Sequence, residues 1–288
     1  FTIGKVGVAG FFLISGYLAI NSIQKRTTKQ FLFNRFVRLY PVYWIILLLT
    51  YLTTIFINHQ DCSITKLLAN ATFFQQYLRI DNMINSSWML SIMVIFFIAI
   101  AIVRTNLKKM KINFVLFSIG ALICIYIRFR YNKPFPTAIF LMSCVGFLGY
   151  FYHAYEDRVK KIIPYLVVFE ITLIISGYLS YKDMLVCYLF AYNGGIALFY
   201  IFKKFSVNIK ALDNLGKLGF TFFLGARIPA DLLHAFVPSL HSHFYIMLAI
   251  HFILCILFSY LITNYIENPM LRKAKEIEKQ FSPTPSKT

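Results

Sequence analysis

The sequence predicts an all-α fold, a polytopic bundle of transmembrane helices, and two observations carry this prediction. Of its 288 residues, 59% are hydrophobic and only 14% are charged, whereas a soluble domain carries about 25% charged residues. Apolar runs of about 20 residues, the length that crosses a bilayer, recur from residue 3 to residue 266. This pattern excludes an ordinary soluble enzyme. We expect one membrane domain at 1–270 and a disordered polar tail at 271–288.

The apolar runs predict about nine spans. The first run, at 4–23, is followed by a basic turn and then by the second run, at 40–58. A polar stretch at 59–87 forms the longest loop, and it separates these two spans from the rest. The remaining spans are expected at 88–103, 112–127, 135–153, 162–180, 184–202, 216–236 and 244–266.

The distribution of basic residues predicts the direction of the spans. The net charge is +18, and most of the 29 Lys and Arg residues fall in alternate loops, near 25–38, 104–111, 158–161, 203–217 and 272–287. The positive-inside rule places these loops and the C-terminus in the cytoplasm and residue 1 outside. We therefore expect a multi-pass protein of a bacterial plasma membrane whose charge faces membrane lipid and not nucleic acid. The five cysteines show no metal-ligand spacing, so no metal site is predicted.

Four short motifs occur in a fixed order along the chain. They are Gly7-Val8 with Phe11-Phe12 and Ser15-Gly16-Tyr17; Arg35 with Arg38-Leu39-Tyr40-Pro41 and Tyr43-Trp44; Trp88-Met89-Leu90-Ser91 with Phe96-Phe97; and Glu267-Asn268-Pro269. In this order the motifs resemble the membrane-bound acyltransferase 3 family. The resemblance covers almost the whole chain.

The resemblance implies a bundle of about ten spans that acts as an O-acyltransferase. Such an enzyme moves an acyl group, commonly acetyl, from cytoplasmic acyl-CoA to a hydroxyl of a cell-surface or lipid-linked glycan. Acyl-CoA, expected to be acetyl-CoA, is then a co-substrate, and no cofactor is bound permanently. The implied process is O-acetylation of a cell-envelope polysaccharide. Two alternatives stay open, a catalytically lapsed membrane scaffold and a glycan-export subunit.

The second motif predicts a binding site for acyl-CoA. Arg35 and Arg38 are three residues apart on a helix that enters the membrane, so their guanidinium groups share a face at the cytoplasmic interface. Such a pair suits the phosphates of CoA, and Tyr40 follows directly. The alternative is that both arginines are interface anchors that bind lipid phosphates. In the third motif, Trp88 is expected to stack on a sugar ring, and Ser91 is assigned to the same substrate site.

The chain departs from the family at three catalytic positions. The family's histidine on its first span has no counterpart here, so we expect this chain to be the interior of a longer protein. Met93 stands at the family's carboxylate position, and Ala226 stands at a second histidine position. The expected span at 216–236 instead carries a different polar set.

This polar set consists of Arg227, Asp231 and His234, whose spacings of four and three place them on one helical face. We predict Asp231 and His234 as an orienting carboxylate and a catalytic base, with Arg227 as a substrate contact. The alternative is an Arg227–Asp231 pair that holds the bundle together while His234 only ends the helix. Pro229 weakens the assumption of a continuous helix.

Overall fold

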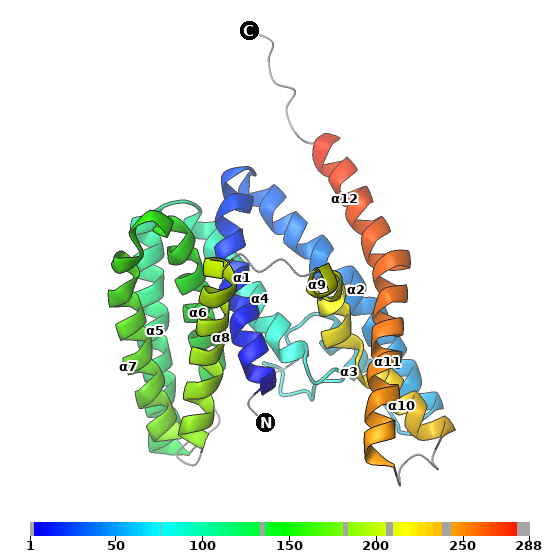
Figure 1. Cartoon of the computed structure of the whole chain (residues 1–288). Coiled ribbons are helices and arrows are strands. Elements are labelled where there is room, and N and C mark those ends of the chain that lie inside the picture. Colours follow the sequence, from blue (N-terminus) through cyan, green and yellow to red (C-terminus); the bar gives the residue numbers. More distant parts are fainter. Residues whose placement is uncertain are drawn as a thin grey trace. The chain divides into compact units, whose positions relative to one another are not determined.

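The computed structural model describes residues 3–75, 77–132, 136–180, 184–205, 210–237 and 243–280 (Figure 1). These residues form helices and connecting loops, with no β-strand among them. Within the described ranges, seven helices are long and apolar enough to cross a membrane, and a shorter apolar helix covers Ser87–Val103. The predicted all-α, polytopic bundle is therefore confirmed.

The helices follow the predicted runs with shifted ends. They are α1 (Ile3–Gln24), α2 (Thr28–Phe56), α3 (Ile64–Ala71), α4 (Ser87–Val103), α5 (Leu107–Tyr131), α6 (Thr137–Ala154), α7 (Ile163–Ser180), α8 (Leu185–Phe205), α9 (Lys210–Gly225), α10 (Arg227–Phe236), α11 (Phe244–Ile262) and α12 (Asn268–Gln280). A 3₁₀ segment, η1, covers Glu156–Ile162, and a π-helical segment, η4, covers Thr263–Glu267.

The second span begins well before its apolar run because a capping box starts α2 in the basic turn. The backbone N–H of Thr27 donates to Oε1 of Gln30 (2.9 Å), and the N–H of Gln30 donates back to Oγ1 of Thr27 (3.3 Å). This reciprocal pair satisfies two donors of the first turn. Arg35 and Arg38 consequently lie inside a continuous helix, as the sequence predicted.

The run expected as a single span at 216–236 consists of two helices, α9 and α10, which meet at Ala226. Pro229 explains the break. It has no N–H for the carbonyl of Gly225, and its ring would clash with that carbonyl in a continuous helix. In the first turn of a new helix, the same proline is tolerated.

The chain divides into two compact units. Unit 1 comprises residues 1–32 and 92–207, and unit 2 comprises residues 33–91 and 208–288. In unit 1, α1 packs against α6 and α8, while α5 packs against α6 and α7. The α1–α6 contact needs glycine, since a Cβ added to Gly16 would lie 1.8 Å from the carbonyl oxygen of Gly146. In unit 2, α11 packs against α9 and α10.

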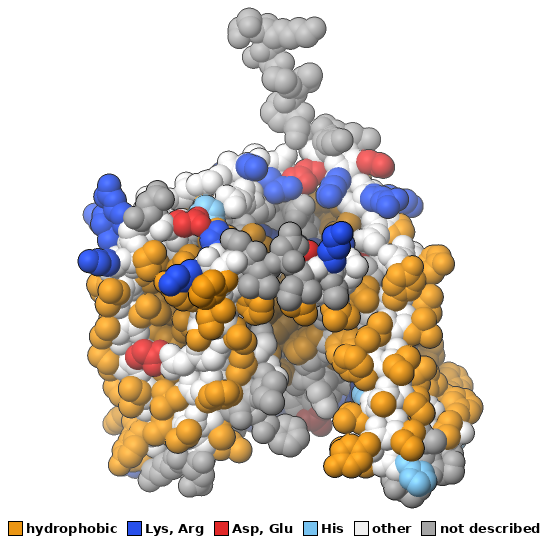
Figure 2. All heavy atoms as spheres, viewed as in Figure 1, with side chains coloured by type: hydrophobic (Ala, Val, Ile, Leu, Met, Phe, Trp, Pro, Cys, Tyr) orange, Lys and Arg blue, Asp and Glu red, His pale blue; other side chains and the backbone are white. Residues whose placement is uncertain are grey.

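The surface of each unit separates charge from apolar side chains. Figure 2 shows hydrophobic side chains along the helices and Lys and Arg side chains gathered toward one helix end. In unit 2 the basic end includes α12, which is helical as far as Gln280 within the tail expected to be disordered from residue 271, while residues 281–288 of that tail lie outside the described residues. Its Ala274 is buried, and the side chain of Asn34 on α2 donates to Glu278 (3.4 Å). Good helix formers in this segment and the contact with α2 account for the difference.

Candidate functional site

Arg35 and Arg38, the predicted CoA-binding pair, lie near the start of α2 in unit 2. Arg35 is half-buried, and Arg38 is exposed. Next to Arg35, the side chain of Asn34 donates a hydrogen bond to the carboxylate of Glu278 on α12 (3.4 Å). The structure thus brings α2, which carries the second sequence motif, into contact with α12, which begins within the fourth motif more than 200 residues later in the chain.

Glu267 is a buried carboxylate held by two hydroxyl groups. Its side chain is 8% exposed. Oε2 accepts hydrogen bonds from Oγ1 of Thr221 on α9 (3.2 Å) and from Oγ1 of Thr263 (3.4 Å). The π-helical turn follows from the next residues, because Pro269 cannot donate to the carbonyl of Tyr265. Such π-turns are frequent at functional sites.

Tyr40 lies one half-turn beyond Arg38, inside a cluster of aromatic rings. Its ring centroid is 4.5 Å from that of Phe36, 4.5 Å from that of Phe73 and 5.5 Å from that of Trp44. The structure therefore places Tyr40 between the arginines and the segment that follows α3. The ring is half-buried, and its packing fixes the position of its hydroxyl.

The segment after α3 was expected to be a plain outer loop, but it contains a buried polar network. Asn70 is fully buried. Its Nδ2 donates to the carbonyls of Lys66 (2.9 Å) and Asp81 (3.1 Å), and its Oδ1 accepts from the N–H of Met83 (3.0 Å). The hydroxyl of Tyr43 donates to the carbonyl of Asn70 (2.9 Å).

A second part of the network involves Gln75, which is also fully buried. Its Nε2 donates to Oδ1 of Asn82 (2.7 Å) and to the hydroxyl of Ser87 (3.0 Å). Its buried Oε1 atom has no hydrogen-bond partner among the described residues, and such atoms are uncommon enough in folded proteins to need an explanation.

This network lies close to the arginine pair along α2. Tyr43, which contacts Asn70, is five residues after Arg38, or about 8 Å along the helix axis. Irregular backbone at membrane depth is tolerated only where it is buried in protein or lines a polar cavity. The network is therefore the part of unit 2 that sequence reasoning missed, since isolated Asn and Gln residues in a polar loop give no signal of burial.

Trp88 and Ser91, the predicted substrate residues, lie in the first two turns of α4 next to this network. Trp88 is half-buried. Ser91 is 1% exposed, and its hydroxyl donates to the carbonyl of Phe73. The hydroxyl of Ser91 therefore helps to hold the loop, while Trp88 keeps part of its ring accessible. The hydroxyl of Ser86, two residues before Trp88, donates to the carbonyl of Phe223 on α9 (3.1 Å).

Arg227, Asp231 and His234 lie on α10 in unit 2. Nε of Arg227 donates to Oδ2 of Asp231 (3.2 Å), and its Nη1 donates to the carbonyl of Met83 (3.0 Å). The predicted Arg–Asp pair therefore exists and also ties α10 to the polar segment after α3. His234 is exposed, two turns from the start of the same helix.

Met93 and Ala226, which stand at family positions for a carboxylate and a histidine, lie in defined surroundings. Met93, at the family's carboxylate position, is fully buried. The carbonyl of Ala226, at the α9–α10 break, lies 2.9 Å from Nε2 of His251 on α11. Among the described residues there is no group of three or more His, Cys, Asp or Glu side chains that could hold a metal ion.

The fold and this site define a multi-pass membrane protein with a cationic pair at one end of a helix and a buried polar segment beside it. The family model described as acyltransferase domain matches residues 1–272. The chain therefore belongs to the acyltransferase 3 family and is a membrane acyltransferase. Searches of curated proteins and of solved structures found no match.

Proposed function

We propose that the protein transfers an acyl group, acetyl in particular, from acyl-CoA to a hydroxyl of a cell-surface or lipid-linked glycan. The observation that carries this proposal is that Arg35 and Arg38 lie three residues apart within one continuous helix, α2, close to its start. Two guanidinium groups on one helical face suit the phosphates of CoA. Arg35 and Tyr40 belong to the same proposed site.

The acceptor side of the proposal uses α10 and the start of α4. The imidazole of His234 removes the proton of the glycan hydroxyl, and the hydroxyl oxygen attacks the thioester carbonyl. The carbon–sulfur bond then breaks, and CoA leaves as a thiol after taking up a proton. Asp231 and Arg227 hold this end of α10, and Trp88 offers a ring face to a sugar.

The catalytically lapsed scaffold remains a second candidate because Met93 and Ala226 replace a carboxylate and an imidazole of the family. A purified scaffold would not transfer the acyl group of acyl-CoA to the glycan. Acyl transfer by the purified protein to a cell-envelope acceptor separates the two functions.

We expect the basic helix ends and the C-terminus to face the cytoplasm, since the positive-inside rule applies to both units. Cysteines introduced as Lys29→Cys and Lys275→Cys should react with a membrane-impermeant thiol reagent only after the cells are permeabilised. Native Cys62, which follows α2 at the expected outer side, provides the internal control and should react in intact cells. Labelling of the introduced cysteines in intact cells would reverse this topology.

Arg38→Ala is expected to weaken acyl-CoA binding by about tenfold to a hundredfold, the value of one charge-assisted hydrogen bond. Arg38→Lys should restore only part of the affinity because an ammonium cannot form the paired contact. Lys217→Ala is the matched control, since it removes a positive charge one helical turn before Thr221. Calorimetric titration with CoA measures all three. Equal losses for Arg38→Ala and Lys217→Ala would show that only the general charge matters.

A further inference from the structure

Unit 1 contains a groove between α1 and α8 that the acyltransfer chemistry does not use. Its volume is about 560 Å³, within the range of pockets that hold small ligands. The lining is apolar apart from one ammonium group, and it includes Gly7, Gly10, Phe11, Gly195, Phe202 and Lys203.

Glycines make both the floor and the opening of the groove. At Gly195 the two helices touch, since an added Cβ would lie 2.8 Å from Cβ of Ala9 and 2.8 Å from the backbone nitrogen of Gly10. At Gly7, by contrast, an added Cβ would meet no atom within 4 Å. The space above Gly7 is therefore open and can hold an occupant without any movement of the helices.

Lys203 closes one end of the groove. Its Nζ donates to the hydroxyl of Tyr17 (2.6 Å) and forms an ion pair with Oε1 of Glu156 (2.7 Å). The hydrogen bond from Lys203 lowers the pKa of Glu156, so this carboxylate stays ionised. A lysine ammonium has three N–H donors, and Tyr17 and Glu156 are its two partners among the described residues. The third donor can bind an anionic group at the mouth of the groove.

The surroundings of Lys203 are strongly basic. At the same end of unit 1, Nη2 of Arg104 donates to the carbonyl of Arg26 (3.0 Å), and the hydroxyl of Tyr150 on α6 donates to the carbonyl of Arg104 (3.0 Å). The described basic residues at this end of unit 1 are Lys25, Arg26, Lys29, Arg104, Lys108, Lys109, Lys111, Arg158, Lys160, Lys161, Lys203 and Lys204, and Glu156 is a described acidic residue among them. An excess of this size attracts anionic lipid headgroups.

The length of the groove matches one leaflet of a bilayer. Gly7 and Tyr17 are ten residues apart on α1, which is about 15 Å along the helix axis. Half of a hydrocarbon core of about 30 Å has the same depth. A lipid chain that starts at the level of Lys203 therefore ends near Gly7.

We propose that this groove binds one acyl chain of an anionic glycerophospholipid, whose phosphate accepts a hydrogen bond from the ammonium group of Lys203. The apolar lining receives the chain, and the basic helix ends select the negative headgroup. Tyr17 and Glu156 hold the ammonium group at the mouth of the groove.

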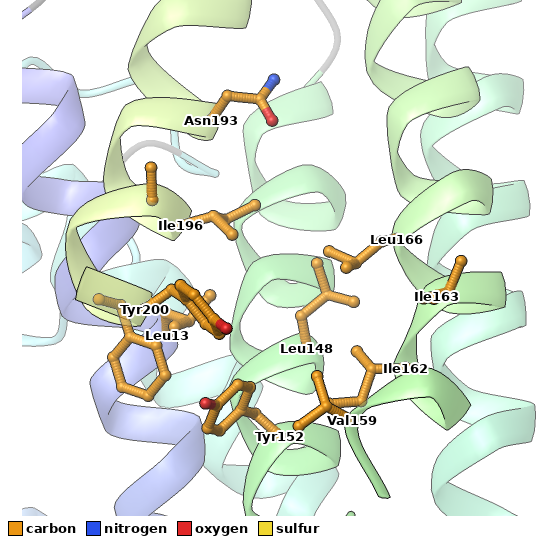
Figure 3. A pocket seen from close by; sticks show the side chains of 12 residues that line it. Leu13, Leu148, Tyr152, Val159, Ile162, Ile163, Leu166, Asn193, Ile196 and Tyr200 are labelled. Carbon is orange, nitrogen blue, oxygen red and sulfur yellow. The ribbon is translucent and has the colours of Figure 1, made fainter. Parts of the chain in front are cut away.

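A second cavity in unit 1, on another side of α8, is a weaker candidate. It has a volume of about 490 Å³ and is lined by apolar residues such as Leu148, Leu166 and Ile196, with Asn193 at one end (Figure 3). Nδ2 of Asn193 donates to the carboxylate of Glu170 (3.2 Å). This cavity offers no cationic side chain, so nothing in it selects an anionic headgroup.

Native mass spectrometry of the purified full chain tests the proposal by titration with phosphatidylglycerol and with phosphatidylcholine of identical chains. The wild type should bind one phosphatidylglycerol about tenfold more tightly than phosphatidylcholine. Lys203→Gln should weaken the binding of phosphatidylglycerol about tenfold, since it removes one charge-assisted hydrogen bond to the lipid phosphate. Lys204→Gln, which removes the same charge from the next residue, should leave this affinity unchanged.

A second pair of variants tests the chain site without changing charge. Gly7→Leu fills the open space and should weaken the binding of both lipids about tenfold, whereas Gly4→Leu, also in open space but outside the lining, should not. Wild-type affinity in Gly7→Leu, equal affinity of the wild type for both lipids, or the same loss in Lys203→Gln and Lys204→Gln would each overturn the proposal. A dimer that Gly7→Leu dissociates would also overturn it, because the groove would then hold a second copy of the chain.

Discussion

Replacing Asn70 with alanine is expected to destabilise unit 2 by about 3 to 5 kcal/mol. The substitution removes three hydrogen bonds of a fully buried side chain. It also leaves the carbonyls of Lys66 and Asp81 and the N–H of Met83 without this partner, and each such buried group costs about 1 to 3 kcal/mol. The carbonyl of Met83 also accepts a hydrogen bond from Arg227. The loss of stability should therefore extend to α10. Acyl transfer should therefore fall along with the melting temperature.

Asn85→Ala is the matched control for this prediction. Asn85 is the same residue type in the same segment, but its side chain is exposed, so its removal should change stability by less than about 0.5 kcal/mol. Thermal unfolding in detergent, followed by the fluorescence of Trp44 and Trp88, measures both variants. Equal melting temperatures for Asn70→Ala and the wild type would mean that the polar network contributes nothing to the fold.

The membrane spans were predictable because burial in lipid imposes a simple rule on composition. A run of about 20 apolar residues is long enough to cross the bilayer. This rule predicted the positions of α1, α5, α6, α7, α8 and α11 within a few residues. Pro229 indicated that the helix at 216–236 would not be continuous. Hydropathy alone predicted one span there, where the structure has α9 and α10. Helix starts were less predictable, since the capping box at Thr27 depends on local hydrogen bonds and not on hydropathy.

The candidate site was predictable in its residues but not in its connections. Spacing on one helix gave the shared faces of Arg35 with Arg38 and of Arg227 with Asp231, because those relations are local. The contacts of Glu267 with Thr221 and of Asn34 with Glu278 depend on how distant helices pack, and no periodicity in a single sequence contains this information. For the same reason, the burial of Asn70 and Gln75 was missed.

His234→Ala is expected to lower the turnover number for acyl transfer by about 10² to 10⁴-fold, the typical contribution of a general base. A sugar hydroxyl is a weak nucleophile until its proton is removed, and the exposed His234 is the base that the proposed function assigns to this step. Binding of CoA should change little, since His234 takes no part in the proposed phosphate site. Asp231→Asn should cause a smaller loss, because it weakens the ion pair with Arg227 but keeps its shape.

His251→Ala provides the decisive comparison, because both histidines belong to unit 2 and differ in their surroundings. The ring of His251 is held beside the carbonyl of Ala226 (2.9 Å) and Sγ of Cys255 (3.2 Å), so its removal should act mainly on the α9–α10 break and on stability. Steady-state transfer of radiolabelled acetyl from acetyl-CoA to a cell-envelope acceptor, at saturating acetyl-CoA, measures both variants. A large loss of turnover in His251→Ala at unchanged melting temperature, with normal turnover in His234→Ala, would move the base from α10 to α11. Turnover at wild-type level in both variants would remove His234 and His251 from the chemical step and leave α10 with the structural role of its Arg227–Asp231 pair.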